Sequence, residues 1–414
     1  MKARIFHFTF FVLVLFVSAC GTLIPPPATV QPDSVTGTPS TPGDSTATSP
    51  AAGTRRDLRV WLPARFDPEA DSAAAHILKA RLDLFARLHP GIQLDIRVKA
   101  ETDPSSLLEM LMLARAAAPD SLPDLIALPR ADLEDAALKS LIHPIEGLTE
   151  ALDEPGWYSY ARQLAHVQNS AYGLPFAGDA LLLAYDPDKY VNPPVSWDVI
   201  LRRPGVLALL GDRPQILFLI GLYRSMNGGL LDTQNRPMLE EFALGPTLAT
   251  VERARLNRSH FVATEEAAWQ EFLDDRAAWT VTTATRALAD PSERFQVAPL
   301  PGLNNDPFTL GTSWIWALAG SDPQGEPLAI ELADWLVDDQ FLSAWINQAG
   351  YLPTRSVDFT GRFPALAAVA ESAQPFPSND VLAALEPVLR EAVIRIFNGE
   401  PVAGVTLDSI EALK

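Results

Sequence analysis

Arginine and aromatic side chains stand beside the predicted strand ends of this chain, where a bound molecule could reach them. Arg65 and Phe66 directly follow one hydrophobic run, Arg130 follows another, and Trp314 and Trp316 lie two residues apart in a third, on the same face of a strand. Aromatic rings cover the apolar face of a ligand, and charged side chains bond its polar rim. These residue types favour binding of a small polar molecule.

The sequence lacks the motifs of several enzyme classes. It has one cysteine, Cys20, which excludes an intramolecular disulfide and a thiolate metal cluster. No two of its six histidines are four residues apart, and HExxH, GxSxG and GxxxxGK[ST] are absent. We expect no metal and no cofactor. Hydrolysis by a pair of carboxylates stays open, because 51 acidic residues form pairs by chance.

The formal net charge of −19 limits the choice of partners. Binding to nucleic acid requires clustered lysines and arginines, so nucleic acid is not expected as a partner. The same sign argues against binding anionic lipid through a charged face. An acidic excess also keeps a secreted protein soluble, and we expect a monomer.

The first twenty residues have the pattern of an export signal. Lys2 and Arg4 precede an almost wholly apolar run, Ile5 to Val17, which is shorter than the ~20 residues that a membrane-spanning helix needs. The run ends in Val-Ser-Ala before Cys20, which resembles a bacterial lipobox. We therefore predict a signal peptide over 1–19 and a lipidated Cys20, with a plain signal peptide or an anchor helix as alternatives.

Residues 20–56 form a distinct segment. Beyond Cys20 the segment is rich in Pro, Thr, Ser and Gly and has no aromatic residue, so it cannot bury enough apolar surface to offset its ordering entropy. We predict a disordered tether, and a glycosylated stalk is the alternative.

Strands and helices alternate after the tether. Strands at 58–62, 92–98 and 123–128 are separated by helices at 72–89 and 105–117, which predicts parallel βαβ units and a sheet covered on both faces. Further strands are predicted at 181–185, 278–283, 295–300 and 313–319, a short helix after Ser196, and further helices at 214–226, 239–255, 265–275, 327–337, 339–348, 363–372, 379–397 and 406–413.

Nearly all of 57–414 resembles the extracellular solute-binding proteins of bacterial ABC importers, in particular the large family that includes the maltose-binding protein. The resemblance rests on segments in the family's order, among them FARLHPGI at 85–92, PDLI at 123–126, YGLPFAGD at 172–179, FLDDRAAW at 272–279 and AGYLPTR at 349–355.

The resemblance implies an α/β fold of two lobes, each a mostly parallel sheet flanked by helices, joined by a hinge. The first lobe would comprise 57–176 and 300–350, and the second 178–298 and 351–414. The ligand would bind in the cleft between them, the lobes would close on it, and the closed form would be presented to a membrane permease. The protein would be held at the outer face of the cytoplasmic membrane through Cys20.

The resemblance and the strand ends together nominate ligand contacts. They are Arg65, Phe66, Arg130, Asp179, Phe218, Tyr223, Trp279, Thr283, Trp314 and Arg355. Trp314 is expected to be a stacking platform, and Trp61 and Trp316 are expected to be core residues. The family often has an aromatic residue just beyond the strand at 278–283, and here Thr282 to Arg286 offer none.

Several functions remain open at this stage. The first is capture of a sugar or oligosaccharide for import, favoured by family frequency alone. A polyamine would suit Asp179 and Trp314, whereas the arginines would suit a sugar acid or a glycerol phosphate. A lipid-anchored sensor and a lipid-anchored enzyme are the remaining alternatives.

Overall fold

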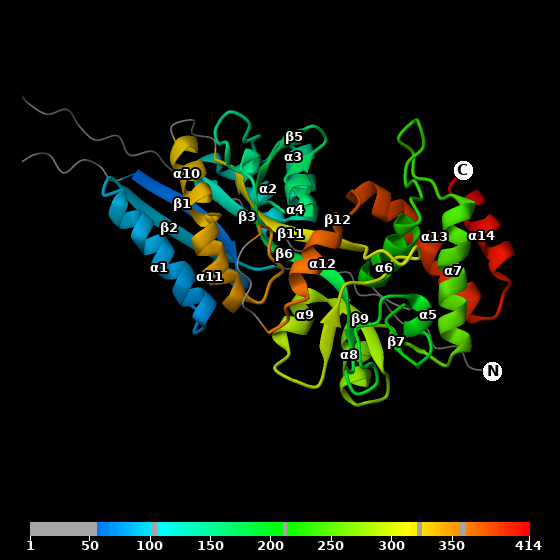
Figure 1. The fold of residues 1–414 in the computed structure, drawn as a ribbon. Coiled ribbons are helices and arrows are strands. Elements are labelled where there is room, and N and C mark those ends of the chain that lie inside the picture. The colour runs from blue at the N-terminus through cyan, green and yellow to red at the C-terminus, as the bar shows by residue number, and fades with distance from the viewer. Residues whose placement is uncertain (1–55, 102–105, 210–212, 321–324, 357–361) are drawn as a thin grey trace, which may run out of the picture. The chain divides into compact units, whose positions relative to one another are not determined.

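The computed structural model describes residues 56–101, 106–209, 213–320, 325–356 and 362–414 (Figure 1). The predicted signal peptide, Cys20 and almost all of the predicted tether lie outside the described residues. All of the described residues belong to one compact unit. Within its described part, no helix is both long enough and apolar enough to span a bilayer.

Ten strands of the described chain form one mixed sheet in the order β2-β1-β3-β11-β6-β9-β7-β8, with β10 on β6 and β12 on β11. Their bounds are β1 Arg56–Pro63, β2 Ile92–Lys99, β3 Leu125–Pro129, β6 Gly173–Tyr185, β7 Val206–Leu207, β8 His260–Phe261, β9 Trp279–Thr283, β10 Gln296–Ala298, β11 Thr309–Leu318 and β12 Ala373–Pro375. A separate two-stranded sheet pairs β4 His166–Val167 with β5 Ser170–Ala171.

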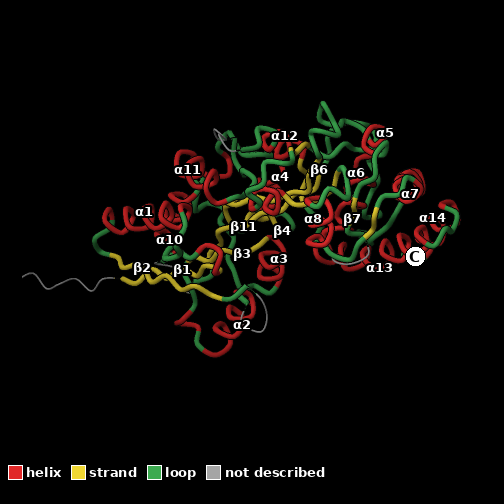
Figure 2. Tube along the Cα trace, turned by 90° about the horizontal axis from the view of Figure 1, so that it is seen from below, coloured by secondary structure: helices red, strands yellow, loops and turns green. Residues whose placement is uncertain are grey.

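Helices flank the sheet. They are α1 Ala73–Leu88, α2 Leu107–Ala117, α3 Arg130–Leu138, α4 Ser159–Leu164, α5 Trp197–Ile200, α6 Arg213–Ser225, α7 Glu241–Leu256, α8 Glu265–Leu273, α9 Ala284–Ala289, α10 Glu326–Leu336, α11 Asp339–Ala349, α12 Leu366–Ser372, α13 Asn379–Phe397 and α14 Val402–Glu411. Short 3-10 turns occupy Ala64–Phe66, Pro119–Ser121 and Ala151–Asp153. Figure 2 shows α1 and α2 on opposite sides of β1 and β2.

Most parallel pairs lie at the two flanks of the sheet, and the short strand β12 adds one parallel pair to the central strand β11. β1 is parallel to both β2 and β3, and β7 is parallel to both β8 and β9. The long strands β6 and β11 are antiparallel to each other, and β11 is also antiparallel to β3. The alternating pattern of the sequence therefore predicted the parallel flank β2-β1-β3, whereas β7 and β8 of the other flank were not predicted. The long central strands connect the two flanks.

Local sequence explains where the helices begin. The Ser72 hydroxyl accepts a hydrogen bond from Ala75 N (3.1 Å) and caps α1, whose Leu78, Leu82 and Phe85 are buried at helical spacing. Ser196 caps α5 in the same way, as predicted from the sequence. Each predicted helix and strand overlaps a described one, but the helices α3, α4 and α9 and the short strands β4, β5, β7, β8 and β12 were not predicted.

Two clusters of buried side chains hold the fold together. One packs α1, α3, α10 and α11 around β1, β3 and the first part of β6. The other packs α6, α7 and α13 against Leu181, Leu183 and Trp279. Trp61 and Trp316 are buried in the first cluster, in agreement with the expectation that they are core residues. The lobe boundaries given above stay predictions.

Candidate functional site

The pairing of β6 with β11 brings three polar or aromatic side chains onto one face of the sheet. Thr312 stands opposite Asp179, and Trp314 stands opposite Ala177. Residues two apart on a strand share a face, so Asp179, Thr312 and Trp314 lie on the same side. All three side chains are partly exposed in strands that are otherwise almost wholly buried. This face is the centre of the candidate site.

Asp179 is held by the start of α9. Its carboxylate accepts hydrogen bonds from the main-chain N–H of Thr285 (3.1 Å), from the Thr285 hydroxyl and from Ala180 N (2.9 Å). Burial raises the pKa of Asp179 to about 6, although the bonds from Thr285 favour the charged form. The group can therefore change its charge just below neutral pH.

Thr283 joins this network from the end of β9. Its side chain accepts from Arg286 N (3.3 Å) and so caps α9. Its hydroxyl and its N–H also donate to Oε1 of Glu265, at 3.2 and 2.9 Å. The hydroxyls of Thr283 and Thr285 are 3.4 Å apart, so the structure brings two predicted site residues, Asp179 and Thr283, into one network.

Trp314 lies in an aromatic cluster with Phe66. The two rings meet edge to face with centroids 5.3 Å apart, and Phe66 also contacts Phe176 at 5.1 Å and Tyr351 at 5.5 Å. The guanidinium of Arg65 lies over the Trp314 ring, 5.1 Å from its centroid. Three predicted site residues thus form one contact group, and Arg65 would have to move for a ligand to stack on the same face of Trp314.

Arg65 is also fixed from the other side. Its Nε and Nη2 donate to Glu101 Oε2 at 2.8 and 2.5 Å. Burial opposes the charge of Arg65, but the hydrogen bonds to Glu101 and to Tyr351 raise its pKa above the ordinary value. Since Glu101 already neutralises it, Arg65 offers a ligand hydrogen-bond donors more than a free charge.

Arg130 was predicted to stand on a loop, but it is the first residue of α3. Its Nη1 donates to Glu134 Oε2 at 3.0 Å, one helical turn away, and its Nη2 donates to the carbonyl of His166 at 3.3 Å. Burial lowers the pKa of Arg130, and Glu134 works against that shift. This half of the site is therefore a largely buried ion pair.

A pocket with a volume of about 240 Å³ adjoins this ion pair, and we call it the α3 pocket. Its polar lining comes from α3, β11 and α13: Arg130, Glu134, Thr312, Asn379 and Glu386. Thr312 therefore connects the α3 pocket with the face that carries Asp179 and Trp314.

Three predicted contacts lie in the second buried cluster. Phe218 is 3% exposed and packs on Trp197, with ring centroids 5.4 Å apart. Tyr223 donates its hydroxyl hydrogen to Gly229 O (2.5 Å), and fully buried Trp279 donates from Nε1 to Arg203 O (3.0 Å). The structure does not bring these three to the face of Asp179 and Trp314, and their roles as ligand contacts stay predictions.

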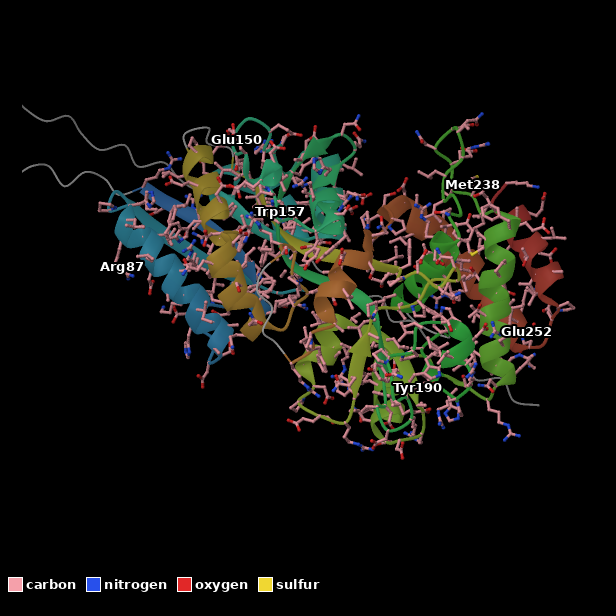
Figure 3. All side chains as sticks on the ribbon, viewed as in Figure 1. Arg87, Glu150, Trp157, Tyr190, Met238 and Glu252 are labelled. Atoms are coloured by element: carbon pink, nitrogen blue, oxygen red, sulfur yellow. The ribbon has the colours of Figure 1, made fainter. Side chains whose placement is uncertain are left out.

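Arg355 is buried and lies apart from the other predicted contacts. It forms ion pairs with Glu154 (3.0 Å) and Asp339 (2.6 Å), and its guanidinium covers the ring of Trp157, which is labelled in Figure 3. It also donates to Val337 O at 3.2 Å. These contacts explain its burial structurally, and its predicted role as a ligand contact stays untested.

Sequence reasoning missed Glu134, Thr285, Thr312 and Asn379. Glu134 stands one helical turn after Arg130, and this spacing could have indicated the ion pair. Thr283 has the residue type of a helix cap and could have indicated α9 and with it Thr285. Asn379 and Thr312 carry no local signal, because their neighbours in the site are distant in the sequence. Among the described residues, no group of three or more His, Cys, Asp or Glu could hold a metal ion.

Solved structures define the class of fold. The chain matches the cyclic alpha-maltosyl-1,6-maltose binding protein of Arthrobacter globiformis, with TM-score 0.72, 15% identity, and 87% of this chain and 98% of that one covered. It matches the sugar-binding protein MalE of Xanthomonas citri, with TM-score 0.71, 18% identity and coverages of 86% and 96%. It also matches UgpB of Mycobacterium tuberculosis in complex with glycerophosphocholine, with TM-score 0.66, 13% identity, and 86% of this chain and 97% of that one covered. The predicted two-lobe α/β fold is confirmed.

The sequence itself settles the family. The model of the bacterial extracellular solute-binding proteins matches residues 84–373, which is most of the chain. The protein therefore belongs to this family. No curated protein sequence matches it.

Proposed function

We propose that this protein is the solute-capturing component of an ABC importer, and that it binds its solute on the face formed by Asp179, Thr312 and Trp314. The observation that carries the proposal is the meeting of the sheet centre, the α3 pocket and the start of α9 at this face. A carboxylate, a hydroxyl and an indole there supply hydrogen bonds for the rim of a solute and a surface for its apolar side. No group in this arrangement needs to do chemistry.

The proposed solute is a small sugar or oligosaccharide. The support is that one structural neighbour is a cyclic alpha-maltosyl-1,6-maltose binding protein and another is a sugar-binding protein, together with the aromatic and hydrogen-bonding groups of the face. A phosphate-bearing solute is the second candidate, because Arg65 and Arg130 lie at this site and one neighbour holds glycerophosphocholine. Closure of the two lobes would enclose the solute and present it to a membrane permease.

The proposal includes lipid anchoring at Cys20, which would keep the protein outside the cytoplasm and beside its permease. A single acyl chain anchors a protein to a membrane only weakly, so more than one acyl chain on Cys20 would be required. A monomer is sufficient for this role, since every residue of the proposed site belongs to one chain.

Thermal unfolding of the full-length protein tests the proposed function. The panel would hold sugars, sugar phosphates, glycerol phosphates, polyamines and amino acids. A ligand at 100 times its dissociation constant should stabilise the fold by ~2.7 kcal/mol. A shift with sugars supports the proposed solute, a shift with phosphates alone selects the second candidate, and a shift with polyamines alone refutes both.

A further inference from the structure

The wall of the α3 pocket is mostly apolar. Apart from Ala131, its apolar side chains come from Pro129, Ile216, Leu217, Phe376, Pro377 and Leu382. They belong to β3, α6, α13 and the segment before α13, so the pocket is built by the fold and not by one loop. A sugar hydroxyl placed against such a wall would lose its hydrogen bonds to water without replacement.

The charged and amide groups of the pocket are already bonded within the protein. Arg130 and Glu134 pair with each other, and Glu386 pairs with Arg390 at 2.5 Å. The side-chain amide of Asn379 donates to Ala131 O and Asp135 Oδ1, at 2.9 and 3.0 Å. A polar solute would have to break these bonds before it could use the groups.

Within the described residues, Thr312 is the one polar side chain of this wall that makes no hydrogen bond of its own; Nε of Arg130 is also unpaired, but it is buried. Thr312 stands opposite Asp179 in the sheet. The pocket therefore offers an apolar body together with the unpaired hydroxyl of Thr312, which lies at the side that continues to Asp179 and Trp314.

The volume of the pocket limits the size of what enters. A cavity of ~150 Å³ lined by Leu, Ile and Phe binds benzene. The α3 pocket, at about 240 Å³, holds one ring of this size with some room to spare, but not a drug-sized molecule.

We propose that the solute carries an apolar, ring-sized group that enters the α3 pocket, attached to a polar part that reaches Thr312 and Asp179. An aryl glycoside has this chemistry and an unsubstituted oligosaccharide does not. Only the polar part of the solute rests on the proposed function, because the apolar group is inferred from the pocket wall itself.

Matched pairs of compounds test this inference on the full-length protein. Each pair consists of the methyl glycoside and the phenyl glycoside of the same sugar, and the sugars are glucose, galactose, xylose and mannose. Indole is added as an aromatic ring that carries no sugar. Dissociation constants come from calorimetry or from the shift in thermal unfolding. For at least one sugar, the phenyl compound should bind at least ~10-fold more tightly than the methyl compound, since small apolar groups in such pockets change affinity by about 10–200-fold.

Two substitutions of alanine by phenylalanine test whether the effect arises in the α3 pocket. Ala131 is an exposed residue of α3 at the pocket wall, so Ala131→Phe fills the pocket without removing a core side chain. Ala383 is an exposed residue of α13 outside the pocket lining, and Ala383→Phe is the matched control. The preference for phenyl should disappear in Ala131→Phe and persist in Ala383→Phe.

The outcomes separate this inference from the proposed function. If the methyl and phenyl glycosides of every sugar bind with equal affinity, the inference of an apolar group in the solute is refuted. The proposed capture of a sugar would then still stand, provided that a sugar binds. If neither indole nor any phenyl compound binds at 10 mM, the inference is overturned, whatever other compounds bind. Binding of indole that is lost in Ala131→Phe alone would support the pocket even where no sugar binds.

Discussion

The main-chain N–H of Asn379 donates a hydrogen bond to Oε1 of Glu134 over 3.1 Å, and so joins the start of α13 to α3. The side chain of Asn379 adds bonds to Ala131 O and Asp135 Oδ1. α3 packs in the first buried cluster and α13 in the second. These three bonds therefore connect the two cores beside the α3 pocket.

Asn379→Ala should loosen this connection. The change removes two side-chain hydrogen bonds, and at ~0.5–1.5 kcal/mol each it should lower the free energy of unfolding by about 1–3 kcal/mol. It should also broaden the distribution of distances between α1 and α14. Spin labels at Asp83→Cys and Leu407→Cys, both exposed, measure this distance, because Cys20→Ser removes the chain's only native cysteine.

The control for this change is Asn398→Ala. Asn398 is exposed at the other end of α13, and its side chain makes no bond within the described residues. Its variant should match the parent in stability and in the distance distribution. Equal broadening in both variants would mean that α13 itself has been weakened, and the connection through Glu134 would have to be abandoned.

Asp179 should make stability depend on pH in the acid range. Its pKa in the folded protein is about 6, above the ordinary 3.8, so the folded state binds a proton that the unfolded state has released between these values. Its contribution to stability is fully present below pH 3.8 and is lost as the pH rises through about 6. The full loss corresponds to at most ~3 kcal/mol.

Asp179→Asn should abolish this contribution. Urea unfolding of both proteins from pH 4 to pH 7 gives the difference between their free energies of unfolding, and the parent should lose stability relative to the variant as the pH rises. A difference that is constant over this range would show that Asp179 titrates normally. Thr285→Val keeps the carboxylate but removes one hydrogen bond to it, and should move the pKa of Asp179 still higher.

Sequence alone predicted most elements of the fold, because their signals are local. Ser72 caps α1 and Leu78 and Leu82 repeat at helical spacing, and both features can be read without a structure. α3 was missed because Pro129 stands at its N-cap position and no side chain there accepts a hydrogen bond. A strand followed at once by a helix without such a cap has the appearance of a strand followed by a loop.

The site was harder to predict than the fold, because its contacts join distant segments. Asp179 is 106 residues from Thr285, and Glu134 is 245 residues from Asn379. Residue type also does not predict whether a side chain is buried. Phe218 and Trp314 are both aromatic, yet Phe218 is buried in the cluster around α6, α7 and α13, whereas Trp314 is partly exposed. Only the pairing of β6 with β11 shows which aromatic residue shares a face with Asp179.

Trp314→Ala should weaken solute binding without unfolding the protein. The ring is partly exposed and contacts Phe66 and Arg65, so its loss leaves the buried cluster largely intact. If the solute stacks on the indole, binding should weaken by ~1–3 kcal/mol. Calorimetry with a compound that the unfolding panel identifies measures this change, with Trp314→Phe as the conservative variant. Unchanged affinity in a folded Trp314→Ala protein would assign Trp314 to packing alone.

Cys20→Ser should release the protein from membranes. The hydroxyl of serine cannot take the thioether-linked lipid that the predicted lipobox places on the cysteine, and the chain has no second thiol to replace it. Metabolic labelling with a radioactive fatty acid and separation of membrane from soluble fractions measure both consequences in one experiment. Ser18→Thr, which keeps Cys20 and a small hydroxyl residue before it, should retain label and membrane association. Label that persists in Cys20→Ser would refute the lipobox, whereas loss of label with continued sedimentation would show that residues 5–17 stay attached as an anchor helix.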